Sequence, residues 1–125
     1  MVKLATINIK ISDLINNTFA VTTEEGEILF NEILKNFEEG NKIILDFTML
    51  EIIISTFFNA SIGQLYSIYD GQFLKENLSI INLSNDDLNV LAKVIERAKQ
   101  YFKDKQSFEN LLNQNKIASK QNNKN

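Results

Sequence analysis

The sequence contains no cysteine, histidine, proline or tryptophan among its 125 residues. The absence of cysteine excludes disulfide bonds, zinc-thiolate sites, cysteine nucleophiles and thiol redox motifs, and is typical of a cytoplasmic protein. The absence of histidine removes the most common general base near neutral pH and the most common metal ligand. Carboxylate pairs remain in principle, but no spacing indicates one. We therefore expect no catalytic residue, no metal, no cofactor and no enzymatic activity.

The chain is also short of positive charge and of long apolar runs. Its formal net charge is −3, which gives no general attraction for nucleic acid. The longest apolar runs are far too short to span a bilayer, and polar Asn8 and Lys10 interrupt the first segment before a signal peptide can form. We therefore expect a soluble cytoplasmic protein that has neither membrane nor nucleic acid as a partner.

The first third of the chain carries clear signals of two strands and a helix. Apolar and polar residues alternate over 4–10, which predicts an edge strand with one exposed face. Residues 19–21 predict a second short strand or an extended connection. Thr22 or Thr23, followed by several glutamates, predicts the start of a helix that ends near 39–41.

The remainder alternates between strands and helices. Residues 42–47 contain a continuous apolar run, which predicts a central strand covered on both faces. Residues 52–54 then lead into a helix that we expect to end at Asp70 and Gly71. A further strand is predicted over 78–83, followed by a helix that opens at 84–87. The two helices are expected to turn these residues toward the core: Phe58, Ile62, Leu65 and Tyr69, then Leu88, Leu91, Ile95 and Phe102.

This order predicts an α/β fold with a mixed sheet of four or five strands packed by about three helices. The folded domain is predicted to span residues 1–103. Residues 104–125 are expected to form a short helix, which carries Phe108, Leu111 and Leu112, and a disordered polar tail.

The most informative segment joins the central strand to the following helix. It contains Asp46-Phe47 at the strand end, Ser55-Thr56-Phe57 before the helix, then Asn59 and Gly63-Gln64-Leu65. The segment resembles the STAS-like domains of unknown function, which are related to the STAS domains of anti-sigma-factor antagonists and sulfate transporters. The resemblance covers roughly residues 4–103 and includes the later strand and turn, Ile80-Ile81-Asn82-Leu83-Ser84.

The resemblance implies a partner-switching function. In anti-sigma-factor antagonists, a hydroxyl residue at the helix start is phosphorylated by a partner kinase, and the matching position is Thr56, with Ser55 beside it. The implied partner is a protein, such as a kinase-like ATPase or a regulator. Ile54 and Phe57 depart from the antagonist pattern and make the site more apolar. The residues expected to contact the partner are Phe57, Asn59, Gly63, Gln64 and Asp46.

Simpler interpretations stand beside these. Ser55 and Thr56 are residue types that commonly cap a helix without any regulatory role. Asp46, at a strand end, is more typical of a turn that binds nearby backbone amides.

At the level of function, the first expectation is a non-enzymatic interaction module. The alternatives are a small-ligand or nucleotide sensor and a self-assembling structural or phage-encoded interaction protein.

Overall fold

The computed structural model describes the backbone of residues 5–122 and the side chains of residues 5–113. Helices and strands alternate along the chain, as the sequence predicts. They follow one another in the order β1 (Thr6–Lys10), α1 (Ile11–Leu14), β2 (Phe19–Ala20), α2 (Thr23–Glu38), β3 (Lys42–Asp46), β4 (Ile52–Ile53), α3 (Ser55–Phe58), a π-helical turn η1 (Asn59–Gly63), α4 (Gly71–Asn77), β5 (Leu78–Ile81) and α5 (Asn85–Asn122).

The strands form two parallel sheets. The main sheet has the order β1-β3-β5, so β3 is central and β1 lies at an edge, which confirms both predictions. Strands β2 and β4 pair only with each other, through Phe19 and Ile52 and through Ala20 and Ile53. The expected single mixed sheet is therefore wrong. The chain leaves the main sheet through α1 directly after β1, and β2 then pairs with β4 instead.

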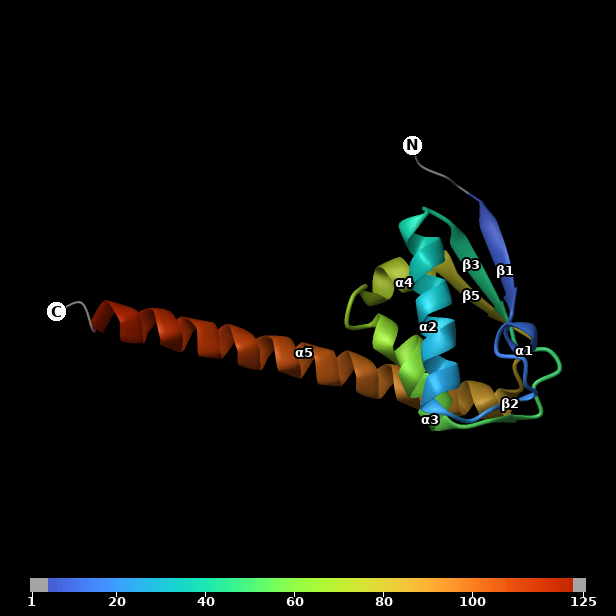
Figure 1. Cartoon of the computed structure of the whole chain (residues 1–125). Coiled ribbons are helices and arrows are strands. Elements are labelled where there is room, and N and C mark those ends of the chain that lie inside the picture. The colour runs from blue at the N-terminus through green and yellow to red at the C-terminus, as the bar shows by residue number, and fades with distance from the viewer. Residues whose placement is uncertain (1–4, 123–125) are drawn as a thin grey trace.

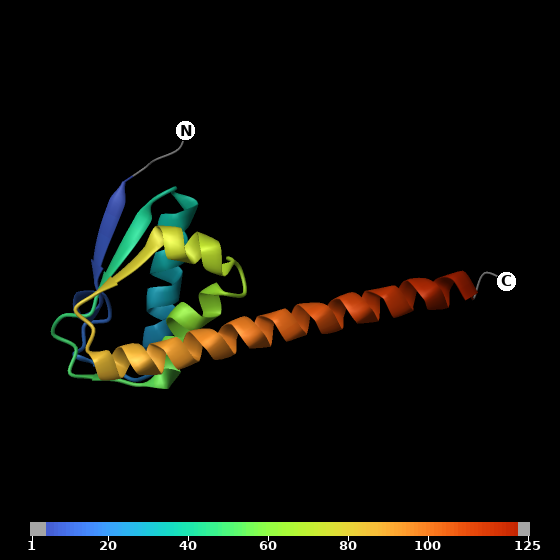
Figure 2. The ribbon, with the colours of Figure 1, turned by 180° about the vertical axis from the view of Figure 1, so that it is seen from behind.

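The helices lie on one side of the main sheet (Figures 1 and 2). Ile43 and Leu45 of β3 point toward them and are buried, whereas Ile44 between them is only half-buried. Strands β1 and β5 likewise have exposed residues on the outer face. The prediction that β3 is covered on both faces is thus wrong, because a continuous apolar run does not distinguish one covered face from two.

Helix α2 begins and ends where the sequence predicts. The Thr22 hydroxyl accepts a hydrogen bond from the backbone N–H of Glu25 at 3.1 Å, and the Glu25 carboxylate accepts one from the N–H of Thr22 at 3.2 Å. This reciprocal capping box satisfies two amides that the first helical turn leaves free. At the other end, Gly40 adopts a φ of 82°, which only glycine adopts without strain.

Helix α4 was missed at the sequence level. The sequence predicts that Asp70-Gly71 ends the preceding helix, but the Asp70 carboxylate accepts a hydrogen bond from the N–H of Phe73 at 2.8 Å and caps a new helix. The Phe73 ring stacks on Tyr69, and both meet Phe37 of α2 edge to face. An aromatic cluster thereby anchors α4 to α2.

Helix α5 is longer than predicted. It continues past Lys103 to Asn122 and projects away from the rest of the molecule (Figure 1), so the expected short helix is part of one long helix, and the disorder of the polar tail stays a prediction. Residues 123–125 lie outside the described residues. Leu91 is buried as predicted, but Leu88 is exposed. Within the described residues, no helix combines the length and the apolar character needed to cross a membrane.

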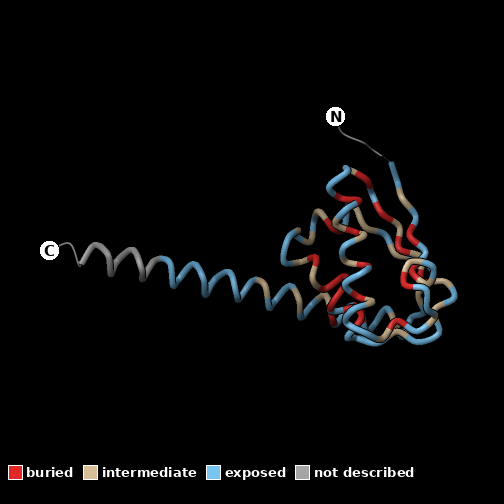
Figure 3. Tube along the Cα trace, in the orientation of Figure 1, coloured by how far each residue is buried: buried red, intermediate tan, exposed pale blue. Residues whose placement is uncertain are grey.

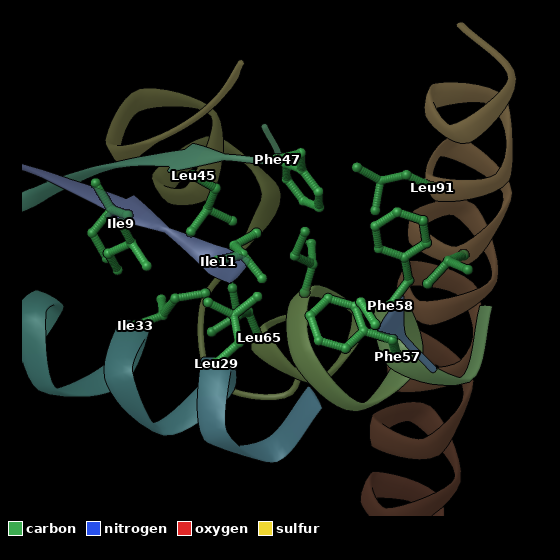
Figure 4. Packing of buried hydrophobic residues seen from close by; sticks show 14 of the residues in the cluster. Ile9, Ile11, Leu29, Ile33, Leu45, Phe47, Phe57, Phe58, Leu65 and Leu91 are labelled. Carbon is green, nitrogen blue, oxygen red and sulfur yellow. The ribbon is translucent and has the colours of Figure 1, made fainter. Parts of the chain in front are cut away.

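The core lies between the main sheet, α2, the α3–η1 segment and the first turns of α5 (Figure 4). Phe57, Phe58 and Leu65 come from the helical segment and meet residues from all the surrounding elements. This core fixes the start of α3 relative to the sheet.

Candidate functional site

The start of α3 presents two hydroxyls to solvent. Ile54 is the residue before the helix, and its backbone is extended, with φ −118° and ψ 165°. Ser55 and Thr56 follow in the first turn and are both exposed. Since no side chain caps this helix, the interpretation of these two residues as caps is wrong. Whether either hydroxyl is phosphorylated stays a prediction.

An exposed apolar surface lies directly before these hydroxyls. In the small sheet, Ala20 is buried and Ile53 is half-buried, whereas Phe19 and Ile52 on the opposite face are 44% and 48% exposed. The backbone N–H of Ile54 donates to the carbonyl of Ala20 at 3.2 Å, so the extended pairing continues to the helix, and Ile54 is also exposed. We call Phe19, Ile52 and Ile54 the β2/β4 patch.

Hydrogen bonds between β2 and the residue before β4 hold the patch in place. The N–H of Glu51 donates to the carbonyl of Thr18 at 2.8 Å, and the Thr18 hydroxyl donates to the Glu51 carboxylate at 2.6 Å. These bonds fix the register that sets Phe19 beside Ile52. The sequence did not reveal this surface, because apolar residues in strands normally indicate the core.

Phe57 lies in the core, not on the surface. Phe57 and Phe58 are both 0% exposed, and their rings lie 6.2 Å apart, measured between centroids. Phe58 also lies near Phe47 at the end of β3 (Figure 4). The prediction that Phe57 contacts a partner is therefore wrong for this conformation. Its role is to anchor the start of α3, with Ser55 and Thr56, to the core.

The π-helical turn that follows packs closely against α2. A Cβ atom added to Gly26 of α2 would lie 2.6 Å from Cβ of Ala60 and 2.8 Å from the carbonyl oxygen of Phe57. The Ser61 hydroxyl is fully buried and donates to the carbonyl of Phe57 at 2.7 Å. Only glycine at position 26 permits this approach. Single π-helical turns often occur at functional sites.

Three predicted partner-binding residues meet α5 at one pocket. Asn59 is exposed, Gln64 is half-buried, and Gly63 is buried because Val94 of α5 packs against it. Gly63 is thus a packing residue whose missing side chain lets α5 approach. The pocket has a volume of about 220 Å³, and we call it the α5 pocket. Its walls are Asn59, Gly63, Gln64, Arg97, Ala98, Tyr101 and Phe102.

Asp46 lies away from these surfaces, at the carboxyl end of β3. Its carboxylate accepts hydrogen bonds from the Asn82 side chain at 2.9 Å and from the N–H of Thr48 at 3.0 Å. The hydrogen bond from Asn82, the hydrogen bond from Thr48 and the charge of Lys10 lower the pKa of Asp46 below its ordinary value of 3.8. The turn role expected for Asp46 is confirmed, and a contact with a partner stays a prediction.

The site is therefore apolar and hydroxyl-bearing in character. Among the residues that the structure describes, no three acidic side chains gather where they would hold a metal ion. What the arrangement offers is a recognition surface, the β2/β4 patch, with two accessible hydroxyls at its border.

Comparison with known proteins identifies a family. The model of a family described as a STAS-like domain of unknown function matches residues 25–88, which is just over half of the chain. The matched segment extends from the first turn of α2 to the first turn of α5 and includes Ser55 and Thr56. No curated protein and no solved structure matches the chain.

Proposed function

The chain belongs to the family of STAS-like domains of unknown function, and on this premise we propose that it is a non-enzymatic interaction module that regulates a protein partner. Its docking surface is the β2/β4 patch together with the exposed first turn of α3. The partner is a kinase-like ATPase or another regulatory protein. Binding is controlled by phosphorylation of Thr56 or Ser55, as in the partner switching of anti-sigma-factor antagonists.

The observation that carries the proposal is the exposure of Phe19 and Ile52 at paired positions of the small parallel sheet. Burying the exposed half of an isoleucine contributes about 1 kcal/mol, and an aromatic ring of similar exposure contributes at least as much. Backbone hydrogen bonds already hold the two strands in register. Little conformational entropy of this segment is therefore lost when a partner binds. A small preformed apolar surface of this kind favours docking of a protein.

The position of the hydroxyls supports the regulatory part. Ser55 and Thr56 directly follow Ile54, so a phosphate on either one lies at the border of the apolar patch. A phosphate adds about −1.5 to −2 charges at pH 7, and charge at an apolar interface disrupts it through desolvation. We therefore expect the unmodified form to bind the partner and the phosphorylated form to release it.

The docking surface is tested by Ile52→Asp, with Ser79→Asp as the matched control. Both changes add one negative charge at an exposed strand position, but Ser79 lies on β5, on the outer face of the main sheet. Each tagged variant is used to capture the products of neighbouring genes, and its affinity for the captured partner is measured. Ile52→Asp should weaken binding at least tenfold, because the complex would bury the new carboxylate without a hydrogen-bond donor or a positive charge beside it. Equal affinities of Ile52→Asp and the wild type would refute the surface.

The switch is tested separately. Thr56→Glu should weaken the complex, whereas Thr56→Gln, which has the same size but no charge, should not. Mass spectrometry after co-expression with the neighbouring genes should detect phosphate on Thr56 or Ser55. An unmodified chain, together with unchanged binding by Thr56→Glu, would leave the interaction module without a phosphorylation switch.

A ligand sensor is the second candidate, favoured by a pocket at the carboxyl end of β1. The pocket has a volume of about 280 Å³, and its walls include Lys10, Ser12 and Asp13. Strand ends of this kind form ligand crevices in α/β sheets, and Lys10 offers a positive charge to a phosphate. A thermal-shift assay with a panel of nucleotides tests this function. A nucleotide that binds in this pocket should raise the melting temperature of the wild type, and Lys10→Ala should abolish that increase. No stabilisation by any nucleotide would reject it.

A further inference from the structure

Only the first half of α5 packs against the rest of the molecule. The helix has 38 residues, which corresponds to a length of about 57 Å at the usual rise per residue. Leu91 and Val94 are buried, and Phe102 is the last residue that is even half-buried. From Lys103 to Asn113 every side chain is exposed, and this part of the helix stands clear of the body (Figure 3).

The projecting part carries apolar side chains on one face, with the charged residues Asp104 and Lys105 between the first two of them. Tyr101, Phe108 and Leu112 are separated by seven and four residues, which places them on one face of a helix, and Leu111 lies at its border. Tyr101 and Phe108 are each 61% exposed. We call these four residues the distal stripe. Apolar side chains gathered on one exposed helix face are typical of a surface that packs against another element.

We propose that the distal stripe packs against the distal stripe of a second copy of this chain, with the two α5 helices antiparallel. A twofold axis near residue 107 then sets Tyr101 and Phe102 of one copy beside Leu112 of the other. Such a contact is isologous, because each copy presents the same surface to its partner, and it closes after two subunits. The result is a dimer built on α5.

Charge supports the antiparallel orientation. Lys105 and Glu109 lie on one flank of the distal stripe, and Asp104 lies on the other flank. In an antiparallel pair the same flanks meet, so Lys105 of each copy lies beside Glu109 of the other. In a parallel pair opposite flanks meet, and Asp104 would face Glu109 of the partner helix. Flanking charges set helix orientation in paired helices, so the sequence disfavours the parallel form.

The α5 pocket gives the partner helix a place to lie. Its walls Arg97 and Tyr101 are on the same side of α5 as Phe108, so the pocket continues the distal stripe onto the body. A partner helix that runs antiparallel from Leu112 onward passes over this pocket. The exposed area of the stripe is roughly 400 Å² per copy on the scale of aromatic side chains. The two stripes together therefore contribute roughly 800 Å², and the pocket walls add little, so the contact belongs to the size class of weak, concentration-dependent association.

The first test is the molar mass of the full chain, measured by light scattering after size exclusion at several concentrations. The wild type should change from 14.3 kDa to twice that mass as the concentration rises through the micromolar range. Phe108→Asp should remain monomeric. The matched control Asn110→Asp adds the same charge on the opposite side of α5 and should dimerise like the wild type. A wild type that is monomeric throughout, a larger assembly, or a dimeric Phe108→Asp would overturn the proposal.

The second test determines the orientation and uses the absence of cysteine from the chain. Tyr101→Cys and Leu112→Cys variants are oxidised alone and as a mixture. An antiparallel pair should yield the disulfide-linked dimer only in the mixture. A parallel pair in register would link each variant to itself, and this outcome, or no link in the mixture, would overturn the antiparallel arrangement.

Discussion

Gly26→Ala should destabilise the protein, although alanine is the better helix former. In the middle of a helix, alanine gains about 1 kcal/mol over glycine. At this position, however, the new Cβ atom would lie 2.6 Å from Cβ of Ala60 and 2.8 Å from a backbone oxygen, both well inside ordinary contact distance. Overpacking of this kind costs about 1–3 kcal/mol, and contacts with a helix backbone favour the upper value. We expect a net loss of about 2 kcal/mol.

Urea unfolding followed by far-ultraviolet circular dichroism measures this change. With a typical urea dependence, a loss of about 2 kcal/mol lowers the midpoint by roughly 1 M. Gly71→Ala is the matched control, because its Cβ would meet the flexible end of the Lys99 side chain at 3.3 Å and a Tyr66 ring carbon at an ordinary contact distance of 4.0 Å. That variant should stay within about 0.5 kcal/mol of the wild type. A midpoint for Gly26→Ala at or above the wild-type value would refute the close packing of α2 against η1.

Three further variants test the fold around the site. Thr22→Ala removes the capping box of α2 and should cost about 1 kcal/mol of unfolding free energy in the same urea assay; no loss would contradict the cap. Phe57→Ala empties a fully buried position and should lower the unfolding free energy by about 3–5 kcal/mol. Almost no loss would mean that Phe57 lies on the surface. Asp46→Ala should destabilise at neutral pH, because hydrogen bonds from Asn82 and Thr48 lower the pKa of Asp46 below 3.8. Its contribution is present above that value and is lost as the pH falls through the lower folded-state pKa, so the difference between wild type and variant should shrink as the pH falls below 3.8. A difference that is unchanged at low pH would reject this linkage.

The sequence predicted most of the fold, because the signals involved are local. The cap at Thr22 and the glycine at position 40 bound α2, and the apolar run of β3 indicated a central strand. Helix α4 was missed because Asp70-Gly71 can either end one helix or cap the next, and long-range packing of Phe73 decides between them. The length of α5 was missed because lysine, asparagine and glutamine suit an exposed helix and a polar tail alike.

The candidate site was predicted only in part. The position of Ser55 and Thr56 at the start of a helix is confirmed, but their exposure depends on Phe57 and Phe58 both pointing into the core. The β2/β4 patch was not predicted, because Phe19 and Ile52 lie far apart in the sequence and each strand has only two residues. Which face of such a short strand is exposed depends on tertiary pairing and not on local pattern.

Hydrogen–deuterium exchange of the captured complex tests the docking surface most directly. Backbone amides around Phe19 and over residues 52–56 should gain protection when the partner binds, while those on the exposed outer face of the main sheet should not change. If protection appears on β1 and β5 and the segments around Phe19 and Ile52 exchange as in the free protein, the β2/β4 patch is not the docking surface.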